Sequence, residues 1–82
     1  MGVPLAEIAV ILRRVLRDHD LEIAPNTRFE DLADWDAMDL ISVVAEIECR
    51  FELQFEVVDI DRLTTVGDLL CMVSAKQALA AA

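Results

Sequence analysis

The sequence contains few of the residues that form turns, disulfides and metal sites. Its 82 residues include two glycines, two prolines, two cysteines, one histidine and no tyrosine, and only 5% are aromatic. Because 56% of the chain is hydrophobic and Gly and Pro are scarce, a disordered chain or a turn-rich β fold is disfavoured. Cys49 and Cys71 form no Cys-x-x-Cys pair, so we expect no metal site and two reduced thiols.

Leader and membrane signals are also missing. The first residues lack the basic start and apolar stretch of a signal peptide, and no run approaches the roughly 18 apolar residues of a membrane span. We therefore expect a cytoplasmic protein without a membrane span, organised as one domain over residues 1–82. No nucleophile stands beside a base and no glycine-rich phosphate loop occurs, so we do not expect an enzyme.

Basic residues are scarce as well, with seven Lys and Arg against sixteen Asp and Glu, for a net charge of −9. The excess acid belongs to the middle of the chain, where residues 30–61 hold eleven acids and one base, Arg50. Such a field repels nucleic acid and attracts basic protein surfaces. The charge pattern therefore excludes nucleic acid and predicts a protein partner with Arg and Lys around its binding site.

The apolar periodicity predicts a mostly α-helical chain. We expect a helix at about 4–19, an ordered loop at 20–35, a helix from 36 to about 50 or 51, a connection at 52–56, a short helix at about 57–62 and a helix from 65 to about 79. Asp36 is predicted to cap the second helix by accepting from the amide three residues on, and Thr65 with Asp68 forms a variant capping box. The side chains predicted to face the core are Leu5, Ile8, Leu12, Val15, Leu16, Ile23, Phe29, Leu32, Leu40, Val44, Ile47, Phe51, Val58, Ile60, Val66, Leu69, Leu70 and Val73.

Short motifs recur in a fixed order along the chain. They are Phe29-Glu30-Asp31-Leu32, Trp35-Asp36-Ala37-Met38, Ala45-Glu46-Ile47-Glu48-Cys49-Arg50-Phe51 and Leu63-Thr64-Thr65-Val66-Gly67-Asp68-Leu69. In this order they resemble the Phe-x-Asp-Leu loop, Trp-Asp-Ser-Leu site, Ala-Leu-Glu-Glu-x-Phe helix end and Thr-Val-x-Asp-Leu entry of the acyl and peptidyl carrier proteins. The resemblance covers nearly the whole chain. It implies an all-α four-helix carrier-protein bundle, with three long helices, one short helix and a long loop between the first two.

The resemblance also implies a function. In that family a phosphopantetheinyl transferase attaches 4′-phosphopantetheine to a Ser at the start of the second helix. The thiol of this arm then carries an acyl or aminoacyl group as a thioester. The implied partners are this transferase, an acyl- or aminoacyl-loading ligase and downstream transferases with basic surfaces, all acting on a monomeric carrier.

One residue departs from the family at the attachment position itself. Ala37 stands where the family has Ser, and its methyl group has no oxygen to carry a phosphodiester. We favour an engineered Ser→Ala change, because the motif on both sides is intact; the alternative is a natural carrier-like domain that has lost the arm. Ser42 and Ser74 are poor substitutes, since both lie well inside predicted helices.

The resemblance assigns partner contacts near this position. Asp36 and Asp39 match acids that flank the site and meet basic residues of the partner. Met38 and Ile41 match the apolar contacts at the centre of such an interface, and Glu48 matches an acid later on the second helix.

Other positions bear on the cargo and on the rival function. Ser42 and Cys49 stand where bacterial fatty-acid carriers usually have acids, which with Trp35 favours a specialised carrier, an aminoacyl group being one candidate cargo. Trp35 itself is interpreted first as a packed loop residue and only second as a ligand contact. The rival hypothesis is a non-catalytic helical adaptor or docking domain that carries no cofactor and uses only the acidic face of its second helix.

Overall fold

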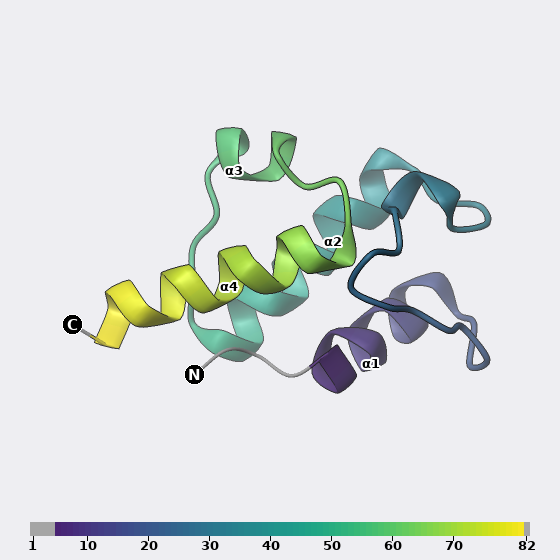
Figure 1. Cartoon of the computed structure of the whole chain (residues 1–82), viewed down its shortest axis with the longest axis horizontal. Coiled ribbons are helices and arrows are strands. Elements are labelled where there is room, and N and C mark those ends of the chain that lie inside the picture. The colour runs from purple at the N-terminus through teal and green to yellow at the C-terminus, as the bar shows by residue number, and fades with distance from the viewer. Residues whose placement is uncertain (1–4, 82) are drawn as a thin grey trace.

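The structure is a computed structural model that describes residues 5–81 of the chain, with side chains described as far as residue 79. This part contains the helices α1 (Leu5–Leu16), α2 (Ala37–Phe51), α3 (Val57–Asp61) and α4 (Val66–Ala81), and a 3₁₀ turn, η1 (Phe29–Asp31). Its β-type pairing is confined to an isolated antiparallel bridge between Arg28 and Thr65. The predicted all-α bundle of three long helices and one short helix is thus confirmed. Figure 1 shows α3 at the edge of the bundle, away from α1.

Helix α1 presents one apolar face to the core, where Ile8, Ile11 and Leu12 are completely buried. The helix ends at Leu16, before the predicted end near His19, because Arg17 adopts a left-handed conformation with φ 55°. Non-glycine residues seldom take this conformation, so residue types alone do not predict the stop. The predicted start at Pro4 lies outside the described residues.

Helix α2 begins and ends where the sequence predicts. Its N-cap is Asp36, and it continues to Phe51, after which Glu52 turns left-handed with φ 55°. Val44 and Ile47 are buried as expected, and Val43 joins them, whereas Leu40 and Phe51 are only partly buried. The fully buried part of the stripe is therefore shorter than predicted and wider by Val43, while Leu40 and Phe51 pack at its two ends.

The long loop between α1 and α2 is ordered by the side chains that it inserts into the core. Phe29 and Leu32 are buried and Ile23 packs against the core, as predicted. The ring of Trp35 stacks on Phe29, with 5.0 Å between ring centroids and 13° between the planes. The packing role that we favoured for Trp35 agrees with this contact.

The same loop is hydrogen-bonded to the start of α4. The amides of Val66 and Gly67 donate to the carbonyls of Thr27 and Pro25 at 2.9 and 2.7 Å, which satisfies donors that a helix start otherwise leaves free. A Cβ on Gly67 would lie 2.8 Å from the Pro25 carbonyl oxygen, so only glycine fits at this close approach.

Helix α3 differs from the prediction in its contribution to the core. None of its residues is fully buried; Ile60 packs partly against the core, as expected. Val58, which was also expected there, is 50% exposed, and this prediction is wrong. Over five residues a helix presents little more than one turn, so its buried side cannot be identified from periodicity.

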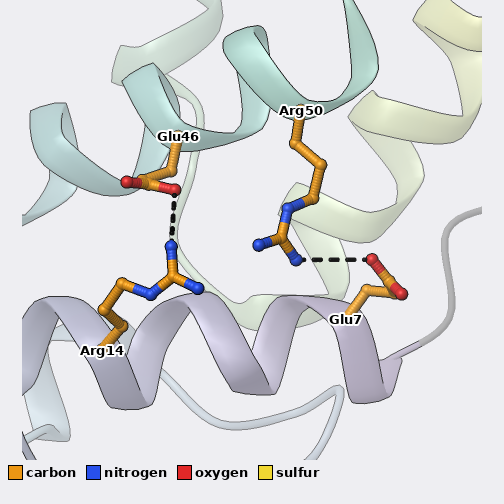
Figure 2. A network of polar contacts seen from close by, with 4 residues as sticks. All are labelled: Glu7, Arg14, Glu46 and Arg50. Atoms are coloured by element: carbon orange, nitrogen blue, oxygen red, sulfur yellow. Dashed lines mark hydrogen bonds and ion pairs between the residues drawn. The ribbon is translucent and has the colours of Figure 1, made fainter.

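Ion pairs across the surface link α1 to α2, as Figure 2 shows. Arg14 Nη1 lies 3.3 Å from Glu46 Oε2, and Arg50 Nη1 lies 3.6 Å from Glu7 Oε2. Because these side chains are 32–57% exposed, the pairs contribute little stability, and burial of apolar residues between the helices dominates. Among the described helices, none combines the length and the apolarity needed to cross a membrane.

Candidate functional site

The candidate site is the N-terminal end of α2, which a reciprocal capping box holds in place. Asp36 Oδ1 accepts from the Asp39 amide at 3.0 Å, and Asp39 Oδ2 accepts from the Asp36 amide at 3.1 Å. Asp36 is extended, with φ −141° and ψ 178°, so the chain turns abruptly from loop into helix at this residue. Ala37 is the first helical residue, and it is exposed.

The first two residues of this helix, Ala37 and Met38, are exposed to solvent. In the described part of the chain, no backbone carbonyl accepts from the amides of Ala37 or Met38. Free amides and the positive end of the helix dipole favour an approaching phosphate at such a position. The side chain of Ala37 has no oxygen, however, so the residues present do not fit a covalently attached phosphopantetheine group.

Exposed apolar side chains lie directly beside Ala37. Met38 is 66% exposed and Ile41, one turn further along α2, is 51% exposed. Met38 and Ile41 are three positions apart on one helix face, so they form a contiguous apolar surface between polar residues, which is a candidate binding surface. The four residues Asp36, Met38, Asp39 and Ile41, all predicted partner contacts, are thus brought together on the first turns of α2; we call them the docking patch.

The electrostatic surroundings of the docking patch are acidic. Residues 30–39, which lead into α2, contain five acids and no base. The carboxylates of Asp36 and Asp39 already accept one amide each, but both hydrogen bonds are solvent-exposed. A carboxylate has about four lone-pair sites, so each of these can also accept from an Arg or Lys of a partner.

The structure places Glu48 apart from the docking patch. It lies near the other end of α2, and its Oε2 accepts a hydrogen bond from the Phe55 amide at 2.8 Å. This partly buried contact fixes the connection between α2 and α3. Its contact with a partner stays a prediction. Its carboxylate also stabilises the fold through the hydrogen bond to Phe55.

A groove of about 540 Å³ between α1 and α2 was not predicted from the sequence. Arg14 and Arg17 line one side of it, and the exposed Ser42 and Cys49 lie on the other. The helical spacing of Ser42 and Cys49 correctly placed both on the exposed side of α2. Nothing in one helix, however, indicated that α1 would form the facing wall.

Sequence reasoning also missed a polar cluster that joins α3 to α4. Lys76 Nζ lies 2.9 Å from Asp59 Oδ2 and 5.3 Å from the centroid of the Phe55 ring. The Glu56 amide, and after it the Lys76 ammonium, hold the pKa of Asp59 below its ordinary value of 3.8. Lys76 is the single lysine of an acidic chain, which was the available signal for this pairing.

Comparison with known proteins supports a carrier-type domain. The family model described as the phosphopantetheine attachment site matches residues 6–73. An acyl carrier protein of Streptococcus pyogenes serotype M3 is 42% identical over 55 residues, which cover 67% of this chain and 70% of that protein. An acyl carrier protein of Streptococcus thermophilus is 36% identical over 67 residues, covering 82% of this chain and 85% of that one.

A solved structure agrees with these sequence matches. The solution structure of a holo acyl carrier protein from Geobacter metallireducens is similar with a TM-score of 0.85 and 25% identity, over 94% of this chain and 88% of that one. The family match contains the whole start of α2. The chain therefore belongs to the acyl carrier proteins, a phosphopantetheine-binding family whose members are carriers and not catalysts.

Proposed function

We propose that this domain is a carrier protein whose attachment position is blocked at Ala37 and whose docking patch is complete. With Ser at position 37 it would tether an acyl or aminoacyl group as a thioester on a 4′-phosphopantetheine arm and present that group to partner enzymes. With Ala it carries no arm and retains recognition. The fold, the capping box and the exposed apolar pair do not depend on the missing hydroxyl.

The observation that carries this proposal is the open start of α2. Ala37 is exposed, it is the first residue of the helix, and a capping acid lies on each side of it. A hydroxyl on this Cβ would be accessible to an enzyme and close to free helix amides. Such a setting would give a transferase access to a serine at this position.

The expected partners can be described from the surface. A phosphopantetheinyl transferase, a loading ligase and downstream transferases would meet acids at Asp36 and Asp39 with basic residues and cover Met38 and Ile41 with apolar ones. Burying the apolar pair supplies affinity, while the acids guide encounter and orientation. Glu48 would add an acid at the far end of the same helix.

The adaptor hypothesis rests on one specific observation, which is Ala37 itself. A docking domain that never carried an arm needs no hydroxyl there. The two hypotheses differ in one respect only: whether a transferase still recognises the start of α2 as a modification site. An engineered Ala37 would also leave a Ser codon in the natural gene.

The test is to supply the missing oxygen. The Ala37→Ser variant is incubated with coenzyme A, Mg²⁺ and a broad-specificity phosphopantetheinyl transferase, and the intact protein mass is measured. We expect the mass to increase by one phosphopantetheine group. The matched control is Ala45→Ser, which places a hydroxyl on an exposed position of the same helix away from its start, and which should stay unmodified. An unmodified Ala37→Ser variant would support the adaptor.

A further inference from the structure

Helix α3 has little to hold it in place by itself. It contains five residues and none of them is fully buried, while Val57 and Val58 are 77% and 50% exposed. An isolated helix of this length is unstable in water, because the entropy lost in forming the first turn exceeds the stabilisation from its hydrogen bonds. Its orientation must therefore come from contacts with the rest of the bundle.

The strongest polar contact comes from α4. Lys76 Nζ lies 2.9 Å from Asp59 Oδ2, and each side chain is only 22% exposed. The same Asp59 oxygen accepts from the Glu56 amide at 2.9 Å and so caps α3. One carboxylate therefore both starts the short helix and binds it to α4.

The connection that leads into α3 is held at the same place. The ring of Phe55 lies under Lys76, 5.3 Å from Nζ, and the Phe55 amide donates to Glu48 of α2 at 2.8 Å. A cation over an aromatic face gains stability when both are shielded from water. Glu48 and Lys76 thus fix Phe55 and Asp59 from two different helices.

We infer that Lys76, Phe55 and Asp59 form a clasp that sets the orientation of α3, and that Lys76 is a positioning residue for partner docking. The second half of this inference rests on the proposed carrier function: the partner is the phosphopantetheinyl transferase, which would contact the exposed Val57 and Val58 of α3. Phe55 and Asp59 lie within the family match, which ends at residue 73, and Lys76 lies beyond it.

The first experiment measures α3 directly, without a partner. Lys76→Met keeps an unbranched apolar side chain over Phe55 and removes the charge; Lys76→Arg keeps the charge and is the matched control. In Lys76→Met we expect the NMR backbone order parameters of residues 57–61 to fall from about 0.85 toward 0.6, with α1 unchanged, and Lys76→Arg to restore them. Unchanged values in α3, or an equal fall along the whole chain, would overturn the clasp.

The second experiment measures docking in the Ala37→Ser background with the transferase. Adding Lys76→Met should raise the KM of the transferase for this domain about three- to fivefold and leave kcat within about twofold. The reason is that fewer molecules hold α3 in the orientation that the transferase binds. Adding Lys76→Arg should restore KM. If Ala37→Ser alone is not modified, the carrier proposal fails. The clasp is then still tested by the order parameters of residues 57–61, which require no partner. If Ala37→Ser is modified with the same KM in the presence of Lys76→Met, the positioning role is refuted.

Discussion

The starts of α2 and α4 use the same capping chemistry in opposite surroundings. At α2, Asp36 and Asp39 exchange hydrogen bonds with each other's amides. At α4, the hydroxyl of Thr65 accepts from the Asp68 amide at 3.1 Å, and the carboxylate of Asp68 accepts from the Thr65 amide at 3.0 Å. Both helices are therefore started by the same local device.

The first residues after each cap differ in their surroundings. The first helical residue is the completely buried Val66 in α4 and the exposed Ala37 in α2. The second is Gly67, pressed against a loop carbonyl, in α4 and the largely exposed Met38 in α2. A cap thus makes a helix start, and only the absence of a covering loop makes that start available to another molecule.

The largest expected effect comes from adding one methyl group at the covered start. Gly67→Ala would place a Cβ 2.8 Å from the Pro25 carbonyl oxygen. Both atoms belong to or adjoin the backbone, so neither the loop nor α4 can relieve the contact by rotating a side chain. We expect a loss of about 1–3 kcal/mol in the free energy of unfolding, measured by urea denaturation. At the equivalent position of α2, Met38→Ala should change it by less than about 0.5 kcal/mol. Equal losses of unfolding free energy in Gly67→Ala and Met38→Ala would show that the starts of α2 and α4 are packed alike.

The next effect concerns the caps themselves. Asp68→Ala removes the acceptor for the amides of both Thr64 and Thr65, at 3.1 and 3.0 Å, and should cost about 1–2 kcal/mol of unfolding free energy. Asp39→Ala removes the acceptor for one exposed amide and should cost about 0.5–1 kcal/mol. Denaturation of both variants under identical conditions ranks them, and a larger loss for Asp39→Ala would contradict this account.

Whether a contact can be predicted from the sequence depends on how far apart its two residues lie along the chain. Both caps join residues only three positions apart, so the sequence predicted the Asp36 cap of α2 and the Thr65–Asp68 box of α4, but not the bond from the Asp36 amide to Asp39. The contact of Gly67 with Pro25 spans the chain from the loop to α4, and nothing near either residue indicates it. Likewise, a surface acid at Glu48 gave no sign that it would bind the Phe55 amide, because that bond requires the chain to turn back after α2.

Low pH should reduce the stability of the start of α4, because it protonates Asp68. The amides of Thr65 and Thr64 hold the pKa of Asp68 below its ordinary value of 3.8, so the unfolded chain binds more protons than the folded one in this range. The stabilisation is complete well above pH 3.8 and disappears as the pH falls through the lower folded value. Asp68→Asn cannot titrate, so its unfolding free energy should fall less than that of the unsubstituted protein between about pH 5 and 2.

Asp59 is expected to add a second acid-sensitive contribution, because its pKa is lowered in the same direction. Asp68→Asn should therefore reduce the loss of stability in acid without abolishing it. An identical pH dependence in the two proteins would show that the amides of Thr64 and Thr65 do not stabilise the ionised form of Asp68.

The smallest expected effect on stability is at the open start. Ala37→Ser adds a hydroxyl to an exposed first helical position, where it buries nothing and displaces nothing. We expect the unfolding free energy to change by less than about 0.5 kcal/mol, as measured by urea denaturation. A large loss would mean that this position is covered in solution.

The most direct test of the central claim is therefore the mass of the Ala37→Ser variant after incubation with coenzyme A and a phosphopantetheinyl transferase, beside the Ala45→Ser variant. We expect the addition of one phosphopantetheine group to Ala37→Ser and none to Ala45→Ser. A folded Ala37→Ser variant that stays unmodified, or equal modification of both variants, would contradict the claim that the open start of α2 is a blocked attachment site.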